Sequence, residues 1–215
     1  MNYKEVEAEV RKESDSVVLV AVSKTRPIED VMAAYSEGAR IFGENRVQEM
    51  EAKFSFDRPK DMKVYLIGQL QSNKVRKAVK LADRIESVDS IKLIDKIEAE
   101  CDRISKDMEI LLEVNSSGEE QKSGFRSKEE LLEAVEHIKH CKHIKLMGLM
   151  TVGPLGFDPK KNSEAFSYAR SLYDIINEMH PISVLSMGMS SDWKEAIEHG
   201  STEIRLGTVI FGERR

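Results

Sequence analysis

Eight short apolar runs that alternate with longer amphipathic segments constrain the fold of this chain more than any other feature. The runs have the length and the β-branched content of buried strands. They span Val17–Val22, Ala39–Asn45, Lys63–Gly68, Arg84–Val88, Glu109–Val114, Ile144–Leu149, Ser183–Met187 and Ile204–Leu206. Strands that alternate with helices form βαβ units, and such units build a parallel sheet.

Helices are predicted in the segments between these strands. Pro27 opens a helix over Ile28–Glu37, and a charged helix over Tyr3–Glu13 precedes the first strand. The remaining helices are predicted over Val47–Phe54, Ser72–Leu81, Ser90–Ile104, Asn162–Met179 and Asp192–His199, and from Ser127 to about His140.

The number of units favours a closed barrel. Eight strand–helix units in 215 residues lie near the lower size limit of the (β/α)₈ or TIM barrel. We therefore expect residues 1–215 to form a single barrel domain. The alternative is an open, doubly wound sheet, but that fold needs fewer strands, and no G-x-G-x-x-G motif follows the first strand.

Charge and cysteine content exclude several classes of function. The net charge is −5, which argues against a nucleic-acid surface, and no apolar run approaches the length of a membrane span. Cys101 and Cys141 lie far apart and form no CxxC or metal-binding pattern. We expect a reduced, cytoplasmic protein and, because no large apolar face is evident, a monomer.

A lysine follows the first strand. Strand alternation places Val20, Val22 and Lys24 on one face, so Lys24 would point into the upper mouth of a barrel. Partial desolvation there disfavours the charged amine, and a neutral amine can form a Schiff base with an aldehyde. The alternative is an ordinary solvated lysine at a strand end.

Two loops near the C-terminus predict a phosphate site. Ser190 lies in the segment Met187–Trp193 after the seventh strand, and Gly207 and Thr208 follow the eighth strand. Barrel enzymes often bind phosphate with the loops after these two strands. The first loop could instead be a simple helix cap, with Ser191 or Asp192 as the N-cap residue.

Arg205 precedes the second loop by two residues and would face the mouth, where it could bind an anion or a ring nitrogen. Glu203 lies on the same face and could hold Arg205 in place, or the two could form a purely structural pair. A lysine for an aldehyde, a phosphate site and an arginine for a ring nitrogen together suggest pyridoxal 5′-phosphate (PLP). A lysine-dependent aldolase acting on a sugar phosphate would use much the same parts.

No metal site is predicted. His137, His140 and His143 are spaced by three, but they fall on the outer ring of the barrel with no carboxylate pattern nearby. We expect these histidines to be solvated.

Seven motifs in order carry a resemblance to a known family. They are Ala21–Thr25, Phe42–Asn45, Ile67–Lys74, Lys122–Phe125, Gly148–Met150, Ser186–Ser190 and Arg205–Thr208 with Phe211–Gly212. From about residue 17 onwards the chain resembles the PLP homeostasis proteins, also called the proline synthetase co-transcribed family. The resemblance implies a barrel similar to the N-terminal domain of alanine racemase.

The resemblance also implies roles for single residues. Lys24 would carry PLP as a Schiff base, and Arg205 would face the pyridine nitrogen. Ser190, Gly207 and Thr208 would contact the phosphate, while Asn45 and Met187 would line the ring. Two positions depart from the family pattern, because Tyr65 stands where a histidine is common and Arg46 where an aromatic residue is common.

The resemblance implies a carrier and regulator of PLP supply without established turnover, which would pass the cofactor to apo-enzymes. Racemisation needs a base on each face of the substrate carbon, and the tyrosine-bearing second domain of alanine racemases is not expected in a chain one barrel long. An arginine at the ring nitrogen would also leave that nitrogen unprotonated and weaken PLP as an electron sink. We therefore expect no catalytic residues; the alternative is a small single-domain amino-acid racemase.

Overall fold

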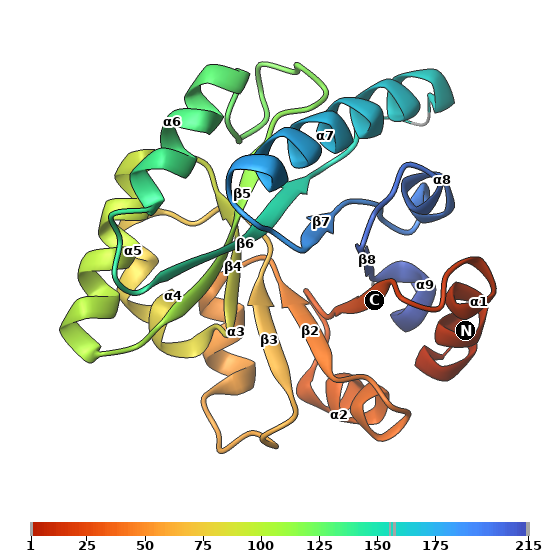
Figure 1. Cartoon of the computed structure of the whole chain (residues 1–215). Coiled ribbons are helices and arrows are strands. Elements are labelled where there is room, and N and C mark those ends of the chain that lie inside the picture. Colours follow the sequence, from red (N-terminus) through yellow and green to blue (C-terminus); the bar gives the residue numbers. More distant parts are fainter. Residues whose placement is uncertain (1, 155, 157, 214–215) are drawn as a thin grey trace.

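The computed structural model describes residues 2–154, 156 and 158–213. At its centre eight parallel strands form a closed barrel in which each strand pairs with its neighbours in sequence order (Figure 1). The predicted (β/α)₈ barrel is therefore confirmed. That residues 1–215 form a single domain stays a prediction.

The strands lie close to their predicted positions. They are β1 (Val18–Val22), β2 (Ile41–Glu44), β3 (Lys63–Leu66), β4 (Arg84–Val88), β5 (Met108–Val114), β6 (Ile144–Thr151), β7 (Val184–Ser186) and β8 (Glu203–Leu206). The barrel closes where β1 pairs with β8, from Val18 opposite Glu203 to Ala21 opposite Leu206. On its other side β1 pairs with β2, with Val22 opposite Gly43. The ends of β8, β1 and β2 consequently lie side by side on one rim.

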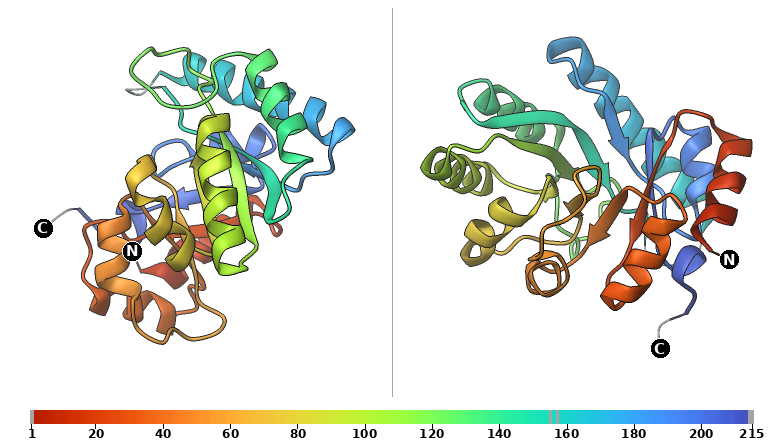
Figure 2. Two further views of the ribbon diagram at one scale, coloured as in Figure 1. Left: turned by 90° about the vertical axis from the view of Figure 1, so that its left-hand side faces the viewer. Right: turned by 90° about the horizontal axis from the view of Figure 1, so that it is seen from below.

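The helices surround the barrel, as the view from below shows (Figure 2). They are α1 (Tyr3–Glu13), α2 (Ile28–Ser36), α3 (Val47–Phe54), α4 (Val75–Leu81), α5 (Ile91–Ile104), α6 (Lys128–Ile138), α7 (Pro159–Met179), α8 (Trp193–Glu198) and α9 (Thr208–Phe211), with a 3₁₀ turn, η1, over Ser72–Lys74. None of the helices within the described ranges is both long and apolar enough to cross a membrane.

Helices α7 and α9 differ from prediction for local reasons. Helix α7 begins three residues earlier than predicted, because Pro159 suits its first turn and the Asp158 carboxylate accepts hydrogen bonds from the Lys160 and Lys161 amides. Helix α9 was not predicted, because a four-residue helix is too short to show a 3.6-residue period.

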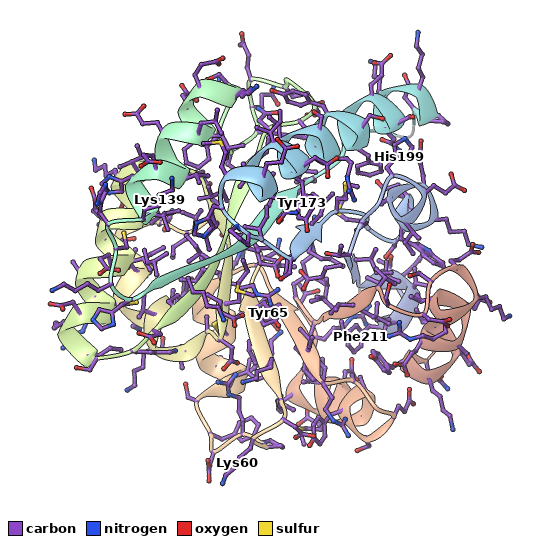
Figure 3. All side chains as sticks on the ribbon, viewed as in Figure 1. Lys60, Tyr65, Lys139, Tyr173, His199 and Phe211 are labelled. Carbon is purple, nitrogen blue, oxygen red and sulfur yellow. The ribbon has the colours of Figure 1, made fainter. Side chains whose placement is uncertain are left out.

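The apolar core lies between the strands and the helices, while the barrel interior is largely polar. Outward-facing side chains such as Phe42, Leu66 and Ile85 are fully buried in one hydrophobic cluster. The alternate positions carry polar groups such as Tyr65 and Glu86, which are also buried. Tyr65 lies at the centre of the molecule in Figure 3, whereas Lys60 lies at its lower edge. The strands therefore place charge and hydrogen-bonding groups along the barrel axis.

The pairing of β6 with β7 requires a glycine at position 148. A Cβ atom there would collide with the backbone carbonyl of Val184, its partner residue on β7. We predict that Gly148→Ala lowers the free energy of unfolding by about 3 kcal/mol or more, since the clash is with backbone that cannot rotate away. Urea denaturation measures the loss.

Gly118→Ala is the matched control. Gly118 has a φ of +69°, and a Cβ atom added to it would meet no other atom within 4 Å, so its substitution carries only the left-handed backbone cost of about 1–2 kcal/mol. Equal losses in the two variants would contradict the clash at Gly148.

Candidate cofactor site

Lys24 occupies a tight turn at the end of β1. The Ser23 amide donates a hydrogen bond to the Gly43 carbonyl (3.0 Å), and the Arg26 amide donates to the Ser23 carbonyl (3.0 Å). Lys24 and Thr25 are therefore the two central residues of the turn. The side chain of Lys24 is partly buried.

The residue after Lys24 is held in a strained conformation. Thr25 has a φ of +64°, which is uncommon for a β-branched residue. Its amide donates to both carboxylate oxygens of Glu49, at 3.1 and 3.2 Å, from the first turn of α3. Strain of this kind persists only when surrounding contacts fix it, and it is concentrated at functional sites.

A buried charge cluster lies directly beneath the turn. The Glu44 Oε1 atom accepts hydrogen bonds from the Ser23 hydroxyl (2.7 Å) and the Lys53 ammonium (2.7 Å), and Lys53 also donates to the Ser23 carbonyl (2.6 Å). Burial raises the pKa of Glu44 to about 7, although the hydrogen bonds from Lys53 and Ser23 act in the opposite direction. The cluster ties the Lys24 turn to β2 and α3.

Sequence reasoning assigned no role to Lys53 or Glu49. One signal was present, because Lys53 shares the buried face of α3 with Val47, Met50 and Phe54. A lysine among buried apolar positions needs a buried acceptor, and Glu44 supplies it.

The loops after β7 and β8 meet at the same rim. The Arg205 amide donates to the Gly188 carbonyl (2.9 Å), and the Gly207 amide donates a long hydrogen bond to the Ser190 hydroxyl (3.4 Å). A Cβ atom on Gly207 would lie 3.3 Å from the Val22 carbonyl, two residues before Lys24. The structure therefore brings the predicted phosphate loops against the end of β1.

The predicted cofactor residues differ in how they reach this rim. Thr208 is exposed, whereas Lys24, Asn45, Ser190 and Gly207 are partly buried. Asn45 follows β2 and packs closely against Gly68, where a Cβ atom would collide with the Asn45 backbone. Met187 is fully buried in the hydrophobic cluster, so it supports the loop from behind, and its predicted contact with the cofactor ring stays a prediction.

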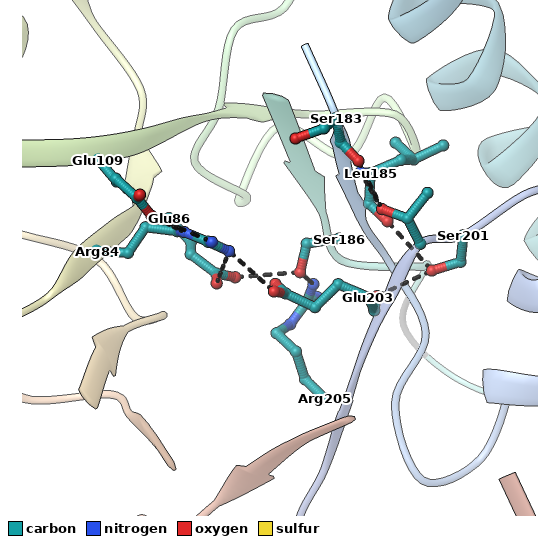
Figure 4. Close-up of polar contacts among 10 residues, drawn as sticks. Arg84, Glu86, Glu109, Ser183, Leu185, Ser186, Ser201, Glu203 and Arg205 are labelled. Atoms are coloured by element: carbon teal, nitrogen blue, oxygen red, sulfur yellow. Dashed lines mark hydrogen bonds and ion pairs between the residues drawn. The ribbon is translucent and has the colours of Figure 1, made fainter. Parts of the chain in front are cut away.

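Arg205 points into the barrel, where two neutral groups orient it. Its Nη1 donates to the Ser186 hydroxyl at 2.7 Å (Figure 4). Its Nη2 donates to the Thr151 carbonyl, also at 2.7 Å. Glu203 is engaged elsewhere, since its carboxylate lies 2.9 Å from the Arg84 guanidinium. The predicted Arg205–Glu203 pair is thus replaced by contacts to β6 and β7.

Two buried carboxyl groups share the interior with these arginines. Burial, the largest cause, together with the charge of Glu203 raises the pKa of Glu86 well above its usual value. One oxygen of each, Glu86 Oε1 and Glu203 Oε1, has no hydrogen-bond partner in the described part of the chain. We infer that Glu86 holds a proton and shares it with Glu203, which would give both oxygens a partner.

Tyr65, which departs from the family pattern, is part of this interior. The Arg84 guanidinium lies over its ring at 4.3 Å from the centroid and also contacts Glu109 at 3.2 Å. The aromatic ring and three carboxyl groups therefore surround Arg84, and the Ser186 hydroxyl, which donates to Glu86 at 3.1 Å, links this set to Arg205.

Comparisons with known proteins identify the family of this chain. The alanine racemase N-terminal domain family matches residues 1–215. The PLP homeostasis protein of Synechocystis sp. is 41% identical over 202 residues, covering 93% of this chain and 92% of that protein. This chain belongs to the PLP homeostasis protein family.

Solved structures support the family and the fold. PipY of Synechococcus elongatus is 35% identical and has been solved without and with PLP bound, with TM-scores of 0.92 and 0.89, each covering 98% of this chain and 100% of that chain. Alanine racemase of Clostridium difficile is 14% identical with a TM-score of 0.84 over 99% of this chain and 56% of its own, which shows the likeness of fold alone.

The histidines of the outer helices are not simply solvated. His137 Nε2 lies 2.7 Å from Asp95, and His143 contacts Asp102 and Asp107 at 3.5 and 3.0 Å, so two of the three histidines pair with carboxylates rather than with solvent alone. No group of three or more His, Cys, Asp or Glu residues suited to a metal ion occurs among the residues the structure describes.

The shared proton can be tested with a pair of variants. Glu86→Gln keeps a donor toward Glu203 and mimics the protonated acid, so at neutral pH we expect a change of less than about 1 kcal/mol in the free energy of unfolding. Arg84→Met leaves Glu203 without its cation and should cost about 3–5 kcal/mol. Equal losses in urea denaturation would show that Glu86 is ionised.

The Glu44 cluster predicts a pH dependence of stability. The pKa of Glu44 is about 7 in the folded state and 4.5 as its ordinary value. The stabilisation by the proton bound to Glu44 is therefore complete below pH 4.5 and is lost as the pH rises through 7. Relative to Glu44→Gln, the unfolding free energy of the wild type should fall by roughly 2–3 kcal/mol between about pH 4.5 and 8. Urea titrations across this range measure it.

Glu51→Gln, which removes an exposed carboxylate of α3, the helix that carries Lys53, is the control and should leave the wild-type pH profile unchanged. A Glu44→Gln profile parallel to the wild type would contradict the raised pKa.

Proposed function

We propose that this chain binds PLP as a Schiff base of Lys24 and serves to hold and release the cofactor. The observation that carries the proposal is the meeting of the Lys24 turn with the loops at Ser190 and Gly207 on one rim of the barrel. The PLP bound to PipY and the names of the relatives support it.

The residues present fit the cofactor. The Ser190 hydroxyl, the Gly207 backbone and the Thr208 hydroxyl suit a phosphate group, because small residues allow close backbone approach and supply donors. The Lys24 amine suits the aldehyde. PLP, when bound, supplies an aldehyde that joins to amines and a ring that withdraws electrons.

Arg205 favours a carrier over an enzyme. Its guanidinium is only 4% exposed and cannot lose its proton, and its two described hydrogen bonds go to neutral acceptors. A permanent cation beside the pyridine nitrogen disfavours protonation of that nitrogen. Without that proton the ring withdraws electrons less strongly, and amino-acid chemistry is slowed.

Absorption spectroscopy and peptide mapping test the proposal. We expect the purified protein to be yellow after incubation with PLP, and borohydride to fix the cofactor on the peptide that contains Lys24. Lys24→Ala should lose the fixed label, whereas Lys145→Ala, which removes an exposed lysine at the start of β6, should keep it. A label that survives Lys24→Ala would overturn the attachment site.

A second measurement separates carrier from racemase. The carrier should activate an apo-enzyme that requires PLP and should show no more α-deuterium exchange on a panel of amino acids than Lys24→Ala. Exchange well above that control would support a small racemase. Borohydride labelling that needs no PLP and occurs only with a sugar phosphate would instead support an aldolase.

A further inference from the structure

A cavity opens on the rim beside the proposed cofactor site. Its volume is about 560 Å³, which is in the range of small-molecule sites, and it lies between the loops that follow β2 and β3. Its polar lining comes from Asn45, Arg46, Gln48, Gln69, Gln71 and Lys74. Asn45 therefore lies at the border between this cavity and the proposed PLP site.

The charge of this cavity distinguishes it from four others on the described surface. Each of those four contains at least one carboxylate in its lining, such as Glu113, Asp174, Asp30 or Glu164. The cavity at Arg46 and Lys74 contains two cations and no carboxylate. Neither cation has a hydrogen bond or an ion pair from its side chain to any residue in the described ranges.

The side-chain amides that line the cavity also lack hydrogen-bond partners among the described residues. No hydrogen bond to another described residue engages the side-chain amides of Asn45, Gln48, Gln69 or Gln71. Arg46 is the N-cap residue of α3, but its side chain accepts no hydrogen bond from the helix. The backbone amides of the first turn, including that of Gln48, are therefore not capped by Arg46. A chain of net charge −5 thus leaves a cluster of cations and donors unneutralised in a concave site.

We propose that this cavity is a second ligand site that binds a phosphate monoester. A phosphate monoester carries close to two negative charges at neutral pH, which Arg46 and Lys74 together balance. Arginine offers paired donors to phosphate oxygens, lysine offers a compact charge, and amide side chains can bind the organic part. Arg46, which replaces a common aromatic residue of the family pattern, supplies one of the two charges.

The site is distinct from the proposed PLP phosphate loops. Those loops follow β7 and β8, whereas the cavity follows β2 and β3, and β1 with Lys24 lies between them in the barrel order. A ligand in the cavity would approach Lys24 from the side opposite Ser190 and Gly207.

Isothermal titration of the cofactor-loaded protein tests the proposal. PLP is first fixed with borohydride and free PLP removed, so that the cofactor site is filled. Glycerol 2-phosphate should then bind one equivalent per chain, and Arg46→Gln or Lys74→Gln should weaken that binding by about tenfold or more, as expected for the loss of a charge-assisted hydrogen bond. Lys145→Gln, which removes an exposed cation at the far end of the barrel, should bind as the wild type does.

Three results would overturn the proposal. The first is that glycerol 2-phosphate shows no saturable binding. The second is that the wild type and both cavity variants bind it equally. The third is that succinate binds as tightly as glycerol 2-phosphate, which would indicate a general anion site. Thermal denaturation of each variant verifies that the fold is retained. If no PLP label forms on Lys24, the proposed function fails. The same titrations with unmodified wild type, Arg46→Gln and Lys74→Gln still test whether the cavity binds a phosphate monoester.

Discussion

The interior of this barrel depends on a buried carboxyl pair, Glu86 and Glu203, that is placed between two arginines. Arg84 lies below the pair and Arg205 near the mouth, with Ser186 as the link between Glu86 and Arg205. Two full negative charges at this depth would repel one another and lose their hydration, so a shared proton is the arrangement that allows both groups to be buried.

A second buried network fixes the position of the Lys24 turn. Glu44, Lys53 and the Ser23 backbone lock the end of β1 to its neighbours, and Glu49 holds Thr25 at its unfavourable φ. The Lys24 backbone is therefore fixed before any ligand binds, which lowers the ordering cost of binding. In both networks polar residues in the strands position a side chain at the rim.

The barrel could be predicted from sequence because its signal is repeated in every unit, with apolar strands followed by amphipathic helices. The rim residues Lys24, Ser190 and Gly207 could be placed because parallel strands end on one side. The partners of Arg205 could not, since Ser186 and Thr151 lie on other strands and their contact depends on barrel stagger and rotamer. Lys53 was missed for a similar reason: a lysine on a helix is normally solvated, and only the tertiary contact with Glu44 reveals its role.

The position of Lys24 between two regions suited to phosphate gives the rim an asymmetry that a simple binding pocket lacks. On one side are small residues and backbone amides at Ser190 and Gly207, and on the other are the side-chain cations Arg46 and Lys74. Backbone donors are fixed in place and favour long retention, whereas exposed side chains lose rotamer entropy on binding and favour faster exchange. The proposed role of holding and releasing a phosphorylated cofactor would use both properties around one amine, and this rim places them on opposite sides of it.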